Sequence, residues 1–477
     1  MPNLAEALPQ YTGYVRLPRS LWVAGGLAAI AVLAGPHPVV GIAALAAVPL
    51  LVALSWRSFE VPVITFIAGY HWLQATMLLW VAAVSGTPIE ELARFPGARM
   101  LEATVLTLLG VVVMILGTRA AWTNWPNPHP FAPGKIAGMR PERALLLYAI
   151  LATFGVAADA MRLAAPAAWQ LVTAIKQARI AFLFLLCLYC LQQRRHWVLL
   201  GSALAFDVIT GFFSYFSEFK TAIFVVVLAL LTTGVEGLTQ RQKATIAATG
   251  VLLLTFAAFW GSIKADYRVF LNQGSGAQES VVSRGEQAAK LRELMRGQDL
   301  DLSQGLYWSV VRFGYVEFFG HVLNQVPWNI PHQDGRILVE AIQHVAVPRL
   351  LNPDKPPLVP DIVVTQTYTG LYLGGAGDTS ISMGYMADAY IDFGRLGMYL
   401  AIFAWGVLLG GVYYWFNRTG DPLLAAAGMA VLLPVALLET TAIKQLGGLL
   451  SAALVVGGAL YVFGDRLRRW LFRPEPR

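Results

Sequence analysis

The sequence has too few charged residues for a soluble protein of its length. Only 13% of its 477 residues are Asp, Glu, Lys or Arg, and 57% are hydrophobic, whereas soluble domains carry about 25% charged residues. So few charges cannot cover a water-facing surface of this size, which excludes an ordinary soluble protein. The apolar residues recur in blocks long enough to cross a bilayer. The sequence therefore predicts an integral membrane protein.

Cysteine is nearly absent. The only two, Cys187 and Cys190, lie in one apolar run. A C-x-x-C pair suggests redox or zinc chemistry, but no second pair completes a metal site. We therefore expect two small apolar residues of a helix. The segment 264–396 contains no cysteine, which excludes stabilisation of that segment by disulfides.

Motifs for nucleotides and catalytic metals are missing. There is no G-x-x-x-x-G-K-[ST] loop, no G-x-G-x-x-G after a strand and no H-E-x-x-H, so the sequence favours neither nucleotide use nor a zinc protease. Asp299-Leu300-Asp301 matches a D-x-D metal motif, but three residues are a weak signal. We expect no cofactor and no metal. The net charge of +7 is better explained by membrane orientation and anionic lipid than by nucleic acid.

Long apolar blocks predict an all-α polytopic membrane protein with about 12 transmembrane helices. Residues 1–263 form an N-terminal transmembrane bundle, 264–396 an extracytoplasmic loop region, and 397–477 the C-terminal transmembrane helices with a cytoplasmic tail. The first two helices are short and could form a hairpin that does not cross fully. The twelve expected helices are 21–35, 38–56, 61–84, 101–118, 144–160, 179–193, 197–216, 221–236, 244–263, 397–416, 422–440 and 446–464.

Basic residues predict the orientation. With both termini in the cytoplasm, 17 Lys and Arg fall in inner segments, from Arg16 to Arg477. The short outer loops then hold 7: Arg94, Arg99, Arg162, Lys176, Arg179, Lys220 and Lys444. This asymmetry is the positive-inside pattern, from which long translocated segments are exempt. Residues 264–396 are therefore expected outside, with helices at 284–301, 308–326 and 336–347 and a structured loop after Pro348.

Ionisable residues within the expected spans are few. The candidates for a role in transport are His71, Asp159, Asp207 and Glu439. Transporters usually mark their route with such residues, so their scarcity argues against transport. Asp207 is the deepest, and either a proton carrier or a structural hydrogen-bond partner fits it.

The expected outer face is rich in cations. Taken singly, each is best explained as an interfacial Lys or Arg whose apolar stem lies in the membrane and whose charged group reaches water. Several fixed cations together could form a binding site for a diphosphate. They are Lys220, Lys264, Arg268, Arg312, Arg349 and Lys355, the last two in a proline-rich stretch that restricts the backbone.

Three consecutive stretches resemble a known family. They are the proline-rich 348–356, the Thr-Ser segment 378–384, and 388–397, which reads Asp-Ala-Tyr-Ile-Asp-Phe-Gly-Arg-Leu-Gly. Their order and spacing are similar to those of Wzy-type O-antigen and exopolysaccharide polymerases. In that family Glu is common where this chain has Asp388, and Asn where it has Asp392. The first departure puts an exact role for Asp388 in doubt.

The resemblance implies a GT-C-like glycosyltransferase of the bacterial inner membrane. Such an enzyme joins undecaprenyl-diphosphate-linked oligosaccharide repeats into a polysaccharide outside the cytoplasm, without nucleotide or metal. Its partners are the lipid-linked substrate and the bilayer, with a chain-length regulator and a flippase. An O-antigen-ligase-like transferase, which uses the same donor with another acceptor, is an alternative. A transporter of lipid-linked oligosaccharide or solute is a second.

The same chemistry suggests candidate site residues. Cations stabilise the departing diphosphate, and a carboxylate takes the proton of the acceptor. For the diphosphate we expect Arg349, Arg312, Arg268 and Lys355, then Lys220 and Arg179. For the proton we expect Asp378 or Asp388, then Glu317 or His344. Aromatic side chains either stack on sugars or only pack: Tyr390, Tyr385, Trp308 and Tyr372.

Overall fold

The computed structural model describes most of the chain as helix. It covers residues 19–122, 128–132, 134–160, 169–212, 220–233, 255, 259–260, 262–263, 266–273, 281–296, 305, 307, 310–311, 313–347, 352, 355, 358–375 and 381–473. No β-strand occurs in these ranges, where the one isolated bridge joins Met139 to Phe472. The expected all-α class is confirmed.

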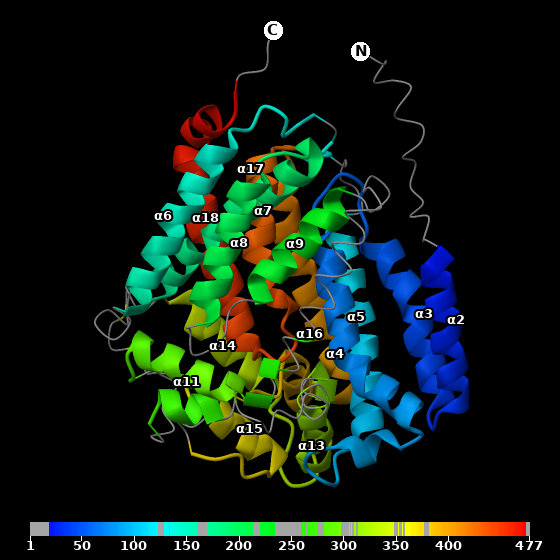
Figure 1. Ribbon diagram of the computed structural model, residues 1–477. Coiled ribbons are helices and arrows are strands. Elements are labelled where there is room, and N and C mark those ends of the chain that lie inside the picture. Colours follow the sequence, from blue (N-terminus) through cyan, green and yellow to red (C-terminus); the bar gives the residue numbers. More distant parts are fainter. Residues whose placement is uncertain are drawn as a thin grey trace.

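Seven of the described helices are long and apolar enough to cross a membrane. Figure 1 shows the long helices packed side by side as one bundle. They are α3 (Pro38–Ser55), α4 (Val63–Ser85), α5 (Met100–Trp122), α6 (Pro141–Ala160), α7 (Trp169–Gln193), α16 (Tyr385–Asn417) and α18 (Ala442–Leu471).

Four further apolar helices are shorter. They are α2 (Arg19–Ala34), α8 (Trp197–Phe212), α9 (Lys220–Thr233) and α17 (Pro422–Leu432), which continues as a 3-10 turn, η5 (Leu433–Ala436). The expected helix 244–263 falls largely outside the described residues. The structure thus supports a helical membrane protein, while twelve complete spans remain a prediction.

Two helices begin earlier than expected. Helix α7 starts at Trp169 rather than 179, so Lys176 and Arg179 lie within it instead of in an outer loop. Polar residues extend this helix because they find partners in the bundle: Gln177 donates to the carbonyl of Ala430 at 2.6 Å. Helix α16 starts at Tyr385 rather than 397, and the kink at Gly394 hides its continuity from the sequence pattern.

Helices α5 and α16 pack backbone against backbone. A Cβ on Gly117 would lie 2.2 Å from the carbonyl oxygen of Phe403, and one on Gly406 would lie 2.1 Å from that of Met114. Both distances are far inside van der Waals contact, so only glycine allows the approach. Small residues at such seams are typical of helix pairs in membranes, where dispersion replaces the hydrophobic effect.

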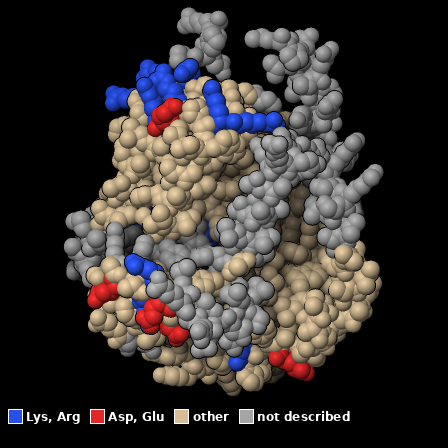
Figure 2. Space-filling view, viewed as in Figure 1, with Lys and Arg blue, Asp and Glu red and all other residues tan. Residues whose placement is uncertain are grey.

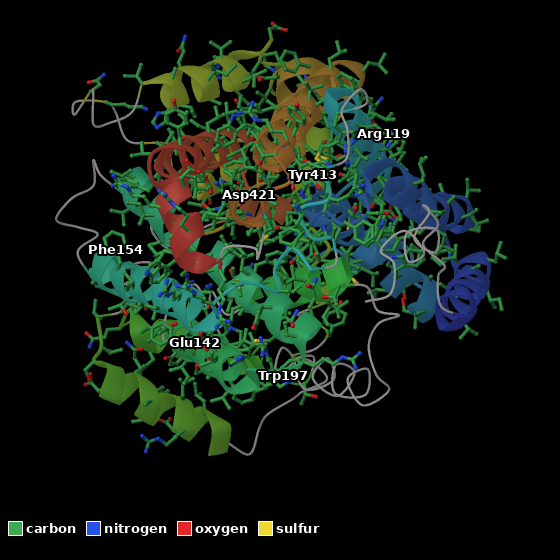
Figure 3. The ribbon with its side chains drawn as sticks, turned by 90° about the horizontal axis from the view of Figure 1, so that it is seen from above. Arg119, Glu142, Phe154, Trp197, Tyr413 and Asp421 are labelled. Carbon is green, nitrogen blue, oxygen red and sulfur yellow. The ribbon has the colours of Figure 1, made fainter. Side chains whose placement is uncertain are left out.

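One end of the bundle gathers the basic residues, and we call it the basic end. Its loops bind one another: Arg140 N donates to Leu471 O at 2.9 Å, and Arg468 pairs with Asp421. Figure 2 shows Lys and Arg concentrated at the top of the molecule. Figure 3 looks down on this end, with Tyr413 and Asp421 near the middle and Glu142 and Trp197 toward α6 and α8.

A buried carboxylate also lies at the basic end. Glu60, in the turn between α3 and α4, is 2% exposed and accepts a 2.5 Å hydrogen bond from Tyr413 Oη. Arg57 pairs with it at 3.1 Å. Burial raises the pKa of Glu60, while the Tyr413 hydroxyl and Arg57 oppose that rise. The pair ties the α3–α4 turn to the end of α16.

Short helices cover the opposite end, which we call the cap. They are η2 (Ile89–Leu92), α11 (Arg284–Arg296), α13 (Glu317–Gln325), α14 (Arg336–Ala346) and α15 (Asp361–Thr369), and the last four lie together at the bottom of Figure 1. Buried Glu317 holds α13 to the loop after η2 through Arg94, at 2.6 Å. Glu317 is therefore structural.

Four expectations for the cap can be compared with these helices. The helix expected at 336–347 is confirmed as α14, residues 284–296 of the one expected at 284–301 are α11, and 317–325 of the one expected at 308–326 are α13. The continuous loop expected after Pro348 is wrong, because α15 and the first turns of α16 are helical. Asp361 supplies a favourable charge in the first turn of α15, and Gly370, with φ of 70°, ends it.

Candidate functional site

The first part of α16 is a separate short helix that joins cap and bundle. Gly384, with φ of 86° and ψ of 154°, precedes it, and Gly394, with φ of 68° and ψ of −172°, ends it. Both conformations belong to a region that essentially only glycine occupies. Residues 385–393 thus form a helix fixed between two glycine bends, and we call it the junction helix.

Two buried carboxylates lie one turn apart on the junction helix, so they share a face. Asp388 is 3% exposed and accepts a 2.8 Å hydrogen bond from the backbone N–H of Ala442, the first residue of α18. Asp392 is 2% exposed and accepts from the N–H groups of Ile337 and Leu338 in the first turn of α14, at 3.0 and 2.8 Å. Each carboxylate satisfies free donors at the positive end of a neighbouring helix.

Replacing Asp392 by alanine should lower the free energy of unfolding by about 1–2 kcal/mol, the usual value of an N-terminal cap. Asparagine should cost less, because its amide oxygen still accepts one of the two bonds. Thermal unfolding of the purified protein checks this. Glu340→Ala, on an exposed side chain of α14, the helix that Asp392 caps, is the matched control and should change little. An alanine variant as stable as the wild type would remove Asp392 from this role.

The turn between η5 and α18 is held by polar side chains from the bundle. His71 Nε2 lies 3.0 Å from the carbonyl oxygen of Val435. Gln74 accepts from the N–H of Leu438 at 3.0 Å and donates to Glu439 at 2.5 Å. His71 and Glu439 therefore help to hold the break between η5 and α18.

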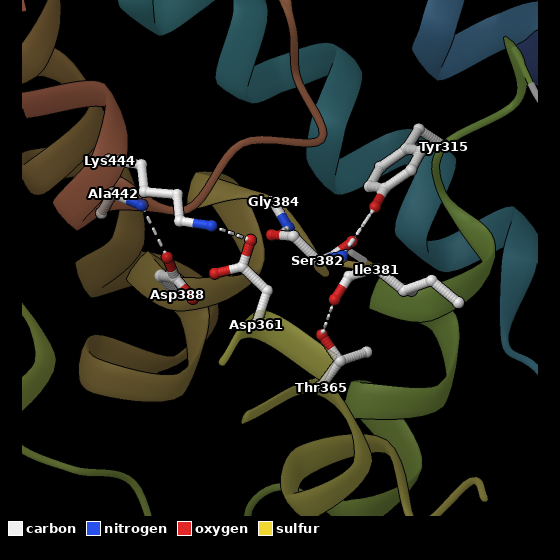
Figure 4. Close-up of polar contacts among 9 residues, drawn as sticks. All are labelled: Tyr315, Asp361, Thr365, Ile381, Ser382, Gly384, Asp388, Ala442 and Lys444. Carbon is white, nitrogen blue, oxygen red and sulfur yellow. Dashed lines mark hydrogen bonds and ion pairs between the residues drawn. The ribbon is translucent and has the colours of Figure 1, made fainter. Parts of the chain in front are cut away.

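Several polar contacts join the start of α18 and residues 381–382 to α15 and to Tyr315, which precedes α13 (Figure 4). Lys444 of α18 pairs with Asp361 of α15 at 2.5 Å. Tyr315 accepts from the N–H of Ser382 at 3.2 Å and donates to its carbonyl oxygen, and Thr365 donates to the carbonyl oxygen of Ile381 at 3.0 Å. The bonds of Tyr315 and Thr365 fix residues 381–384, the segment that leads into the junction helix.

A cavity of about 70 Å³ lies between α14, the junction helix and α18. Its walls are mostly apolar, and the residues with polar atoms that line it are Tyr385, Asp388, Asp392, Trp405 and Gln445. Phe393, which forms part of the wall, is 37% exposed, so the cavity reaches the surface. Asp388 is thus both a helix cap and a cavity wall.

The aromatic candidates fall into two groups. Tyr390 is buried, donates to the carbonyl oxygen of Val326 at 3.0 Å and packs edge-on against Phe319. Tyr385 is buried too, with its hydroxyl 3.3 Å from His71 Nδ1. Tyr390 is therefore a core residue in this structure, whereas Tyr385 also borders the cavity. Tyr372 is 86% exposed, so its ring is free to stack on a sugar.

Four of the six candidate cations lie in described residues, on separate elements. Arg179 lies inside α7 and pairs with Asp207 of α8 at 2.9 Å, so its expected place at a helix end is wrong. Lys355 donates to the carbonyl oxygens of His344 and Val347 at the end of α14. Lys220 begins α9, and Arg268 follows Tyr267, which packs on Trp260. Arg349, Arg312 and Asp378, together with Trp308, lie outside the described residues.

Sequence reasoning missed two residues of the cavity, Gln445 and Trp405. A glutamine within an apolar helix was the available signal, because an amide needs a buried partner there. Gln74 and Gln177 carry the same signal, and both do bind carbonyl or carboxylate oxygens of other elements.

The comparisons with known proteins give a family without an assigned activity. A family model described as a domain of unknown function, DUF8712, matches residues 108–416, which include the junction helix. Neither a curated protein nor a solved structure matches the chain.

Proposed function

Because the chain belongs to the DUF8712 family, whose description names no reaction, we propose a function from its residues: a membrane glycosyltransferase that polymerises undecaprenyl-diphosphate-linked oligosaccharide repeats. The product is an O-antigen or exopolysaccharide, made at the outer face of the bacterial inner membrane. The resemblance of 348–397 to Wzy-type polymerases motivates this proposal.

The observation that carries it is the position of Asp388. It lies in the stretch that resembles the family, on the junction helix, and lines a cavity between cap and bundle. In the proposed step, a hydroxyl oxygen of the acceptor sugar attacks C1 of the donor glycan, and the C1–O bond to the lipid diphosphate breaks. Asp388 takes the hydroxyl proton, and the diphosphate leaves with the bonding electron pair.

Cations would stabilise the charge that develops on the diphosphate. Arg349 and Arg312 are our proposed ligands on the strength of the resemblance, with Arg268 and Lys220 as further candidates. Lys355 is proposed to hold the end of α14, because it donates to two carbonyl oxygens there. We do not propose Arg179 as a ligand of the diphosphate, because it pairs with Asp207 within the bundle.

The proposed activity requires the cap to face outward and the basic end inward. Cysteine in place of Tyr372, which is exposed in the cap, should react with an impermeant thiol reagent in intact cells. Cysteine at Asp465, exposed at the basic end, is the matched control and should react only after lysis. Cys187 and Cys190 are buried and should stay silent. The opposite labelling pattern would reverse the orientation.

Purified protein in lipid should lengthen undecaprenyl-diphosphate-linked repeats without nucleotide or added metal. The glycosyl-diphosphate bond is already activated, so no further energy source is needed. Polymer is detected by gel electrophoresis and mass spectrometry. A strict requirement for a nucleoside triphosphate would contradict the proposal, and transfer only to a different acceptor would identify a ligase.

One observation favours a second candidate, a transporter of lipid-linked oligosaccharide or solute. Arg179 and Asp207 form a largely buried ion pair between α7 and α8, where the side chain of Asp207 is 6% exposed. Charged residues inside a membrane bundle often mark an ion or substrate route. Translocation of the lipid-linked repeat across liposomes, without lengthening, would favour this candidate over the polymerase.

A further inference from the structure

Two arginines from different helices converge on one carboxylate at the cap side of the bundle. Glu102, in the first turn of α5, pairs with Arg99, which directly precedes that helix, and with Arg395 of α16 at 2.5 Å. We call these three residues the arginine cluster. Glu102 balances only one of the two guanidinium charges, and within the described ranges no second carboxylate pairs with either arginine. Nearby Glu90 accepts instead from the N–H of Leu101, at 3.3 Å. The arginine cluster therefore carries a net positive charge.

Both arginines of the cluster are accessible to a ligand. The side chain of Arg99 is 41% exposed and that of Arg395 is 56% exposed. A guanidinium has five N–H donors, so each arginine keeps donors for an acceptor other than Glu102. Their backbones are fixed, because the N–H of Arg99 donates to the carbonyl oxygen of Gly320 in α13 at 3.2 Å and Arg395 follows the bend at Gly394. The two guanidiniums are thus held near each other and remain reachable from outside.

Exposed apolar residues lead away from the arginine cluster along both helices. On α5, exposed Leu109 and Leu116 follow Glu102 at intervals of seven residues, which places all three on one face of the helix. On α16, Leu396 and Leu400 are exposed, and Leu396 is the residue after Arg395. Both helices are candidate membrane spans, so these faces meet lipid tails. The cluster lies at the ends of the two spans, at the level of headgroups.

The chemistry of the arginine cluster selects a lipid that carries phosphate. Arginine binds phosphate oxygens through pairs of parallel N–H···O bonds. Arg99 and Arg395 already contact two different oxygens of a single carboxylate, so they are close enough to hold two neighbouring anionic groups at once. A diphosphate supplies such groups, and an attached prenyl chain can lie on the exposed leucines. A free phosphate would make no use of those leucines.

We propose that Arg99 and Arg395 bind the diphosphate of a prenyl-linked substrate whose chain lies along α5 and α16. The choice of a prenyl diphosphate rests on the proposed function, in which such lipids are the substrates. Glu102 competes with the diphosphate for both arginines and so limits its affinity. Arg99 and Arg395 are binding residues, since the cluster lies on the α5 side of α16, whereas Asp388 contacts α18.

Three substitutions separate a binding site from a structural ion pair. Arg99→Gln and Arg395→Gln each remove one positive charge, and Glu102→Gln removes the competing negative charge. Arg336→Gln is the matched control, because Arg336 is an exposed arginine of the cap that pairs with a carboxylate of its own, that of Glu340, at 3.8 Å. A structural role predicts similar losses of stability in the three cluster variants and no change in lipid binding. A binding role predicts changes in affinity of opposite sign.

Native mass spectrometry of the purified full-length protein, titrated with undecaprenyl diphosphate that carries no glycan, measures the dissociation constant. Each arginine variant should bind about 5- to 20-fold more weakly, which is less than for a buried charged hydrogen bond because both side chains are half-exposed. Glu102→Gln should bind about 2- to 5-fold more tightly, and Arg336→Gln should equal the wild type. Wild-type affinity in both arginine variants, or weaker binding by Glu102→Gln, would overturn the site.

Two further lipids test the identity of the ligand. Undecaprenol has no phosphate, so its binding should be weak and insensitive to the arginine substitutions. Phosphatidylglycerol should bind more weakly than undecaprenyl diphosphate. If it binds as tightly and loses as much affinity in the arginine variants, the site holds a phospholipid headgroup and the diphosphate assignment is wrong.

The binding assay also separates this site from the proposed function. Undecaprenyl diphosphate binding that depends on both arginines, in a protein that forms no polymer from lipid-linked repeats, would retain the site and reject the function. Polymer formation with unchanged lipid binding in both arginine variants would retain the function and reject the site. Melting temperatures show which variants fold, and if one arginine variant does not, the other arginine variant and Glu102→Gln decide.

Discussion

Gly384→Ala should destabilise the protein by more than about 4 kcal/mol and remove most of the folded material from the membrane. Residues other than glycine rarely adopt the φ and ψ of Gly384, because that backbone conformation costs them about 1–3 kcal/mol. The new Cβ would also lie 2.6 Å from the carbonyl oxygen of Leu438. That oxygen belongs to the backbone of the turn before α18, so it cannot rotate away. Effects of this size come from few mechanisms, and strained backbone is one of them.

Gly86→Ala is the control that separates backbone strain at positive φ from the steric clash of a new Cβ with a neighbouring segment. Gly86 also has positive φ, 70°, but lies in the ordinary left-handed region, and nothing is within 4 Å of its Cβ position. Its replacement should cost about 1 kcal/mol. Yield of monodisperse protein and melting temperature are measured for both. Similar losses in the two variants would show that close packing of Gly384 on the turn is unimportant.

Asp388→Asn should reduce polymer formation about 100- to 10,000-fold, the range lost with a general base. Asparagine can still accept the hydrogen bond from Ala442 N–H through its amide oxygen, so α18 should stay capped and the melting temperature should remain near that of wild type. What is lost is the ability to take a proton. Single-turnover kinetics of folded protein measure the effect on the chemical step.

The control for this variant is Asp392→Asn, one turn away on the same face. Its carboxylate has a similar burial and a similar capping role, and it is not proposed to touch substrate. It should polymerise at close to the wild-type rate. If Asp388→Asn is equally active, Asp388 is a structural cap only, and the proton must go elsewhere.

The bundle was predictable because its signals are local. Apolar blocks of spanning length predict α3, α4, α5 and α6 closely, since burial in lipid requires little beyond hydropathy and backbone hydrogen bonds. The start of α7 was missed because Gln177 and Arg179 look like loop residues until their partners, Ala430 and Asp207, are known. Those partners lie far away in the sequence.

The site was only partly predictable for the same reason. The pattern of acidic residues and glycines indicates Asp388 and Gly394. It does not reveal that Asp388 caps the N-terminus of α18 and that Asp392 caps that of α14. When a residue of one helix caps another helix, the two have no fixed separation in the sequence, so no motif reveals the contact. Tyr390 was proposed for sugar stacking from its residue type, and its burial against Phe319 follows only from packing.

The glycine seam between α5 and α16 has a consequence for synthesis of the chain. Gly117 is translated roughly 290 residues before Phe403, and at about 5–20 residues per second this delay is roughly 15–60 s. Throughout that interval the bare backbone face of α5 has no permanent partner in the membrane. Something must occupy it: lipid, an earlier helix of this chain, or an insertion factor of the cell. Ribosome stalling between these two helices should therefore yield an intermediate in which α5 crosslinks to neighbours that it lacks in the finished protein.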